Sequence, residues 1–220
     1  MRTSSRNFAV LLFDEVELWD VTSVMHVASL AGRHWNWRPF RLMPVSATAG
    51  LIDTRSQIRL EAPFDFASCP APEILFIPGG YGARRAASDP RFVDWCAAVA
   101  PRSELVLAIG AGVMLLGAAG LLAGGEVAAA ADSIEWMRPA LPETRLDTES
   151  AVMTSSLGGA PAKLLTAASG KDGLELALRA VERCLGARLA GQLRSSVGAP
   201  PPATRLELRD LPKISRPPRT

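Results

Sequence analysis

A sharp turn between two apolar runs is the first stretch of this sequence that could carry chemistry. The run 105–109 is followed by Gly110-Ala111-Gly112 and then by a longer apolar run. The first run predicts a buried strand and the second a buried helix, so the three small residues must turn the chain between them. Such turns present backbone N–H groups to ligands, and many α/β enzymes carry their nucleophile there. This turn has no Ser, Cys or Thr, so it supplies no side-chain nucleophile.

An acidic residue near the start of the chain is a second candidate. The apolar run 8–13 predicts a first strand, and from Leu18 onward the apolar residues have helical spacing. Asp20 would then lie at the start of a helix. It could act as a general acid or base with a pKa raised by an apolar pocket, or it could be a carboxylate favoured there only by the helix dipole. A buried, unpaired Asp20 beside a cavity would favour catalysis.

A glycine-rich loop after the apolar run 74–77 is the third candidate. The loop reads Pro78-Gly79-Gly80-Tyr81-Gly82. Together with Gly110 and Ala111, the amides of Gly79 and Gly80 could form an anion or oxyanion site. The alternative is that these small residues serve only to make tight turns.

The elements that must position these residues alternate between strands and helices. This alternation predicts an α/β fold of one domain, a parallel sheet with helices on both faces. Ligands of such folds bind beyond the carboxyl ends of the strands, where all three candidate stretches would lie. We expect strands at 8–13, 40–45, 58–61, 74–77, 105–109, 127–131, twice within 145–154, and at 164–168, and helices at 18–31, 89–100, 113–122, 133–137, 173–185 and 188–196.

Composition narrows the functional class. The net charge of +2 over 220 residues gives no indication of a nucleic-acid partner. No apolar run suits a membrane span, and no secretory leader is evident. The three cysteines are odd in number and widely spaced, which predicts neither disulfides nor a metal site and favours a reducing cytoplasm. Residues 1–197 should form the domain, and the Pro- and Arg-rich segment 198–220 an extended arm.

Four motifs in order resemble the ThiJ/PfpI superfamily of class I glutamine-amidotransferase-like proteins, most closely its isonitrile hydratase branch. The resemblance runs from about Phe8 to Val197 and rests on the segments 12–22, 77–82, 118–122 and 173–178. It implies the flavodoxin-like fold of that superfamily, a small-molecule ligand and a homodimer.

Departures from the family pattern concern the nucleophile. The family turn reads Cys-Thr-Gly-Ala, and counting back from the Gly-Leu-Leu at 120–122 puts Gly110 at the Cys position and Ala111 at the Thr position. The His that commonly follows is missing from 128–131. Cys96 and Cys184 lie on predicted amphipathic helices and are interpreted as core residues. Asp20 matches the family Asp that faces the nucleophile.

Two functions are compatible with these residues. The first is a cofactor-independent and metal-independent enzyme in which Asp20 performs acid–base chemistry, namely hydration or dehydration, isomerisation or cyclisation of a carbonyl-bearing molecule. The small residues at the turn predict a larger, more apolar pocket and hence a bulky substrate, with Trp19, Tyr81 and Trp136 as its wall. The alternative is a non-catalytic small-molecule-binding or regulatory protein of the same fold.

Overall fold

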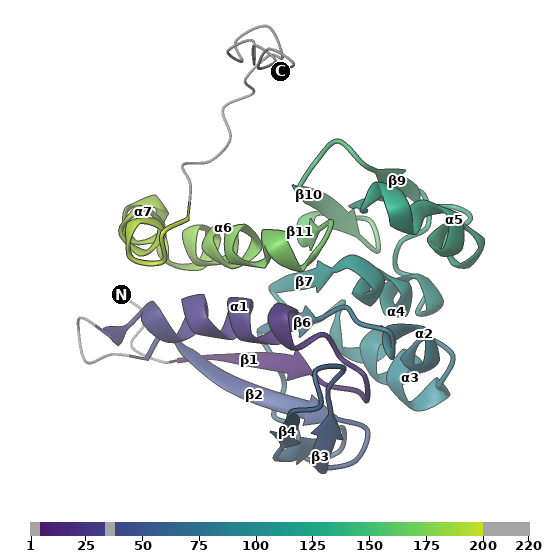
Figure 1. Cartoon of the computed structure of the whole chain (residues 1–220), viewed down its shortest axis with the longest axis horizontal. Helices are drawn as coiled ribbons and strands as arrows, with labels where there is room; N and C mark the ends of the chain where they lie inside the picture. Colours follow the sequence, from purple (N-terminus) through teal and green to yellow (C-terminus); the bar gives the residue numbers. More distant parts are fainter. Residues whose placement is uncertain (1–4, 34–37, 200–220) are drawn as a thin grey trace, which may run out of the picture.

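A seven-stranded sheet forms the centre of the computed structural model, which describes residues 5–33 and 38–199 (Figure 1). The strand order is β10-β11-β7-β6-β1-β2-β5. All neighbours are parallel except β10 and β11. The predicted α/β fold with a parallel sheet is therefore confirmed. The strands are β1 (Arg6–Leu11), β2 (Phe40–Ser46), β5 (Phe64–Asp65), β6 (Ile74–Ile77), β7 (Leu105–Ile109), β10 (Val152–Leu157) and β11 (Ala160–Ala167).

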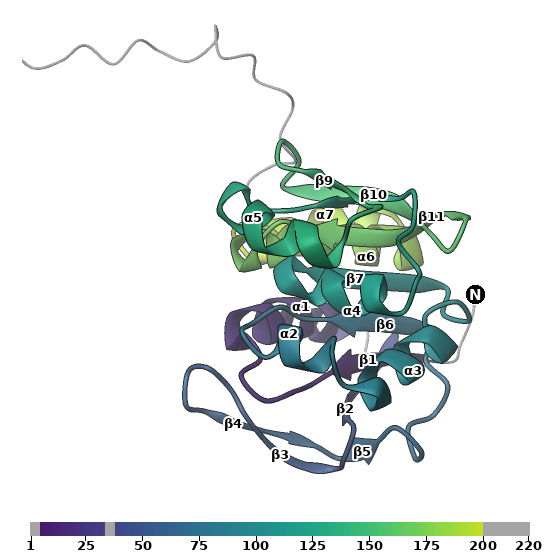
Figure 2. The ribbon, with the colours of Figure 1, turned by 90° about the vertical axis from the view of Figure 1, so that its right-hand side faces the viewer.

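Helices cover both faces of this sheet. One face carries α1, α6 and α7, and the other carries α2, α3 and α4, as the two perpendicular views in Figures 1 and 2 show. The short helix α5 lies on the side of α4. The bounds are α1 (Leu18–Leu30), α2 (Ala83–Ala86), α3 (Pro90–Val99), α4 (Val113–Ala118), α5 (Ile134–Met137), α6 (Gly173–Leu185) and α7 (Ala187–Ser196).

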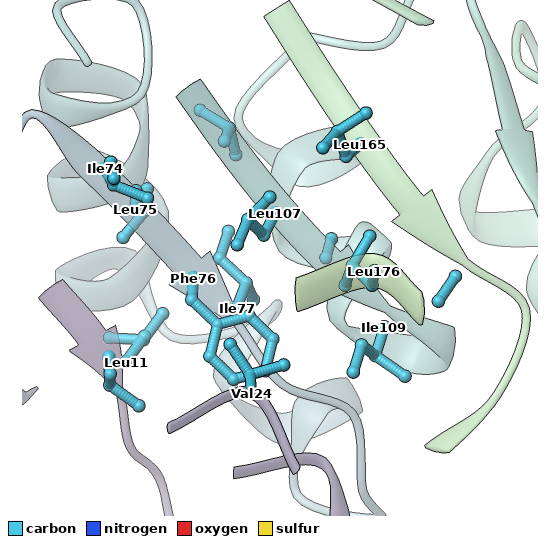
Figure 3. Close-up of a cluster of buried hydrophobic side chains, with 14 of the residues drawn as sticks. Leu11, Val24, Ile74, Leu75, Phe76, Ile77, Leu107, Ile109, Leu165 and Leu176 are labelled. Carbon is cyan, nitrogen blue, oxygen red and sulfur yellow. The ribbon is translucent and has the colours of Figure 1, made fainter. Parts of the chain in front are cut away.

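The two central strands explain why the sequence contains short, uninterrupted apolar runs. Every residue of β6 and of β7 is buried, because helices pack against both faces of these strands. Figure 3 shows Phe76, Leu107 and Ile109 of these strands together with Leu176, which α6 contributes. Burying a side chain of this size contributes about 1.5–3 kcal/mol. The core thus fixes where β6 and β7 end, and the loops beyond those ends build the site.

Several predicted bounds differ from the structure, and each difference has a local cause. The helix expected over 113–122 ends at Ala118, where Gly120 takes a positive φ of 72°. The strand expected over 127–131 is shorter, β8 (Glu126–Ala128), and its partner is β9 (Arg145–Asp147) in a separate two-stranded sheet. The two strands expected within 145–154 are present as β9 and β10, but β9 pairs with β8 and β10 with β11. Three-residue strands contain too few residues to show an apolar period.

A hairpin of β3 (Gly50–Asp53) and β4 (Arg59–Ala62) extends from the main sheet (Figure 2). Only its second strand was predicted, because Gly50 and Leu51 are exposed and show no alternation. Its turn returns to the body of the molecule, where Arg55 N–H donates to the Val16 carbonyl at 3.2 Å. This contact brings residues of the hairpin to the candidate site.

One expectation concerns residues outside the described part of the chain. The arm predicted over 198–220 lies outside the described residues from residue 200 onward. Across residues 5–33 and 38–199, no helix is both long enough and apolar enough to span a membrane.

Candidate functional site

A cavity of about 500 Å³ lies beyond the carboxyl ends of the strands. The loops after β1, β6, β7, β8 and β11 build its floor and walls, and Arg55 reaches it from the β3–β4 turn. This is the place where parallel α/β sheets bind ligands. All three candidate stretches of the sequence meet here.

Asp20 lies at this cavity and is almost completely buried, with 2% of its surface exposed. Its Oδ2 accepts a hydrogen bond of 2.7 Å from the Gly79 N–H. Its Oδ1 has no hydrogen-bond partner among the described residues. The helix N-cap is Glu17, whose side chain accepts from the Trp19 N–H, so Asp20 is not needed as a cap. An unpartnered buried acceptor is costly, by about 1–3 kcal/mol, which indicates a role other than stability.

Two glycines leave room for the Asp20 carboxyl. A Cβ at Gly79 would stand 2.8 Å from Oδ2, and one at Gly170 would collide with Oδ1. The loop after β11 carries Gly170 and is fixed to α1, since the Trp19 Nε1–H donates to the Gly170 carbonyl at 2.9 Å. Larger residues at either glycine would push the carboxyl out of its place.

The environment of Asp20 alters its acidity. Burial raises its pKa from the ordinary 3.8 to about 7, against the opposing effect of the Gly79 hydrogen bond and with some help from the nearby Glu17 charge. Protonated and ionised forms therefore coexist near neutral pH. In the protonated form the hydrogen belongs on Oδ1, because Oδ2 already accepts the Gly79 N–H.

The Gly110 turn has the geometry of a sharp strand-to-helix connection. Gly110 has a φ of +48°, a left-handed conformation that glycine adopts without steric cost. A Cβ there would meet only the Ala168 carbonyl oxygen, at 3.6 Å. Gly80, Gly110 and Ala111 line the cavity together with Gly79. The Gly79 amide already bonds to Asp20, so it offers a ligand less than the sequence suggested.

Two of the three aromatic residues predicted to form the pocket wall are found there. Tyr81 and Trp136 line the cavity. Trp19 does not line it, because its indole is bound to the Gly170 carbonyl and its ring faces outward, with 59% of the residue exposed. Trp19 and Asp20 are consecutive residues of α1, and consecutive residues of a helix point in different directions.

Sequence reasoning missed two arginines at the cavity. The Arg55 guanidinium carbon lies 5.1 Å from the Tyr81 ring centre, and that of Arg84 lies 5.8 Å from the Trp136 ring centre. The cavity is consequently more polar than the sequence suggested. Arg84 follows the glycine-rich loop closely and could have been found, whereas nothing in the sequence links Arg55 to the site.

In the part of the chain that the structure describes, the cavity lining contains no cysteine and no histidine or lysine that could activate a hydroxyl group. None of the three cysteines borders it, and burial raises the pKa of the Cys96 thiol to about 12 and that of Cys69 to about 11. Its hydroxyl side chains are those of Tyr81, Ser133 and Ser169. Ser133 donates to Asp132 and Ser169 to Asp172, so neither serine is paired with a histidine or lysine that could activate it. No cluster of potential metal ligands occurs among the described residues.

A comparison with known protein families decides the relationship. Residues 6–183 match the model of the DJ-1/PfpI family. The chain belongs to this family. Membership agrees with the predicted ThiJ/PfpI resemblance, and the family match includes every residue that lines the cavity.

Individual DJ-1/PfpI relatives are distant. Isonitrile hydratase of Pseudomonas putida is 32% identical over 117 residues, which are 52% of this chain and 47% of that protein. The match thus spans about half of the relative. A THiJ/PfpI family protein from Pseudomonas syringae superimposes with a TM-score of 0.75 and 22% identity, covering 92% of this chain and 78% of the other. DJ-1beta of Drosophila melanogaster superimposes with a TM-score of 0.74 and 15% identity, covering 90% of this chain and 100% of the other. These two structures share the fold.

Proposed function

We propose that this DJ-1/PfpI protein is a cofactor-independent enzyme in which Asp20 is the general acid and base for a carbonyl-bearing small molecule. The observation that carries the proposal is the buried carboxyl whose Oδ1 lacks a partner beside a cavity of about 500 Å³. A ligand that exchanges a hydrogen bond or a proton with Oδ1 would satisfy this atom.

Proton transfer through Oδ1 requires both forms of the carboxyl. With a pKa of about 7, the protonated form donates from Oδ1 and the ionised form accepts there at neutral pH. Such a group typically accelerates a reaction by about 10²- to 10⁴-fold. Hydration or dehydration, isomerisation and cyclisation all consist of such proton transfers at or next to a carbonyl.

Backbone amides supply the second element of the proposed mechanism. The N–H groups of Gly80, Gly110 and Ala111 belong to residues that line the same cavity. In this proposal they donate to the carbonyl oxygen as negative charge develops on it. The Gly79 N–H instead holds Asp20 Oδ2 in place, which leaves Oδ1 as the reacting atom.

The turn after β7 supports a non-covalent mechanism in this proposal. The family resemblance assigns Gly110 to the position of the Cys nucleophile, and a glycine has no side chain with which to attack. Similarity to a protein named isonitrile hydratase supports addition of water as the first reaction class to examine. The small residues at 110 and 111 favour substrates larger than a simple aldehyde.

A panel assay tests the proposal. Purified protein is incubated with isonitriles, aromatic ketones and aldehydes, and products are followed by nuclear magnetic resonance. We expect turnover by the wild type and a loss of about 10²- to 10⁴-fold in kcat for Asp20→Asn. Asp14→Asn is the matched control, because Asp14 lies in the segment that leads into α1, is exposed and does not line the cavity.

The outcomes separate the candidate functions. Full turnover by Asp20→Asn, with Asp14→Asn also active, would refute the acid–base role. Binding of panel compounds without any turnover would instead favour the non-catalytic, ligand-binding alternative.

A further inference from the structure

Two guanidinium groups at the cavity are not held by an ion pair within the described part of the chain. Arg55 lies over Tyr81 and Arg84 over Trp136, and neither takes part in an ion pair or side-chain hydrogen bond with a described residue. A ring contact of this kind contributes about 0.5–1 kcal/mol at an exposed site. It restrains the guanidinium while leaving N–H donors available to a ligand.

Neighbouring arginines on the same two elements differ from this pair. Arg59, on the same hairpin as Arg55, pairs with Asp53 at 2.8 Å. Arg85, which follows Arg84 in α2, pairs with Glu15 at 3.6 Å. Neither Arg59 nor Arg85 lines the cavity. Of these four arginines, the two without a carboxylate partner are the two that border the cavity.

The carboxylates of the cavity lining are engaged elsewhere. Glu17 caps α1 by accepting from the Trp19 N–H, and Asp132 accepts from the Ser133 hydroxyl at 3.2 Å. Buried Asp20 is neutral in part of the molecules near pH 7. A ligand with a single negative charge would meet two cations. The surrounding carboxylates would repel a dianion such as phosphate more strongly than a ligand with a single negative charge.

We infer that Arg55 and Arg84 are specificity-determining residues that bind the carboxylate of the ligand, so that the substrate class is a small oxo acid. The inference rests on the proposed function, since it places the ligand's carbonyl at Asp20 and its carboxylate at the arginines. Arginine suits this role because its planar N–H donors bind carboxylates in a bidentate manner. A volume of about 500 Å³ is sufficient for an oxo acid with an aromatic or branched substituent.

Calorimetric binding of a matched pair of probes tests this inference. The probes are 2-oxo-4-phenylbutanoate and its methyl ester, which keeps the size and the carbonyl and removes the charge. We expect the wild type to bind the acid at least about tenfold more tightly, a preference that weakens with added salt. Arg55→Gln and Arg84→Gln should each weaken acid binding about tenfold and change ester binding less than threefold.

Matched controls make the result specific to the cavity. Arg59→Gln and Arg85→Gln remove the same charge from the same elements outside the cavity, and both should bind the acid like the wild type. Equal affinity for acid and ester, or equal losses in the control variants, would overturn the inference. Tighter, arginine-dependent binding of inorganic phosphate than of the acid would also overturn it, in favour of a phosphate ligand.

Failure of this inference is distinguishable from failure of the proposed function. Arginine-dependent binding of the acid without turnover of any oxo acid would refute the enzyme and keep the carboxylate site. Turnover of neutral carbonyl compounds that depends on Asp20, with no preference for the acid, would refute the carboxylate site and keep the enzyme.

Discussion

The buried carboxyl of Asp20 makes the stability of this protein depend on pH in a defined direction. Its pKa is about 7 in the folded state and close to the ordinary 3.8 in the unfolded chain. The folded state therefore holds the proton more tightly. The stability that this proton contributes is fully present below about pH 4 and is lost as the pH rises through 7.

The size of the effect follows from the same values. Each tenfold change in proton affinity corresponds to about 1.4 kcal/mol. Keeping an ionised Asp20 buried therefore costs about 4 kcal/mol of unfolding free energy at pH 8, most of which is absent at pH 4. Asp20→Asn removes the titration while keeping nearly the same shape and an oxygen that can accept from Gly79. The variant should gain about 4 kcal/mol relative to the wild type between pH 4 and pH 8.

Urea unfolding of both proteins at a series of pH values measures this change. The difference between the two proteins is the quantity of interest, because all other titrating groups contribute nearly equally to both. In thermal unfolding the same change corresponds to roughly 8–16 °C in Tm for a chain of this size.

Asp147→Asn provides a control of opposite sign. Hydrogen bonding, first from the Ser150 side chain, lowers the pKa of Asp147, so its contribution to stability is present at neutral pH and lost as the pH falls. This variant should become less stable than the wild type as the pH rises. If the difference between wild type and Asp20→Asn stays constant within about 1 kcal/mol from pH 4 to pH 8, the reasoning about Asp20 is refuted.

Two further predictions concern the thiol groups and the Gly110 turn. Alkylation of Cys69, Cys96 and Cys184 under conditions that keep the fold, checked by circular dichroism, should leave turnover unchanged; loss of activity after modification of one folded thiol would contradict the non-covalent mechanism. Gly110→Cys should keep the fold at a cost of about 1–2 kcal/mol, because a Cβ has room but φ is +48°. A Tm loss above roughly 10 °C would show that the turn cannot hold a side chain.

Where the sequence predicted the structure well, the relevant signal was local. The bounds of β6 and α6 agree with the prediction, because a short apolar run between turn residues and a long amphipathic period are both visible along the chain. The three loops that meet at the cavity were also predicted, since the carboxyl ends of parallel strands lie at one edge of a sheet. The homodimer and the arm from residue 198 stay predictions.

Tertiary structure alone decided the properties that define the site. The pKa of Asp20 depends on its burial and on the hydrogen bond from Gly79, which is 59 residues away in the sequence. Arg55 reaches the cavity only because the β3–β4 turn docks against Val16. Apolar periodicity records which face of a segment is buried, but it does not record which distant segment covers that face. For this reason the sequence alone determined the fold and the candidate Asp20, whereas the acidity of Asp20 and the arginines in the same cavity wall arise from contacts made on folding.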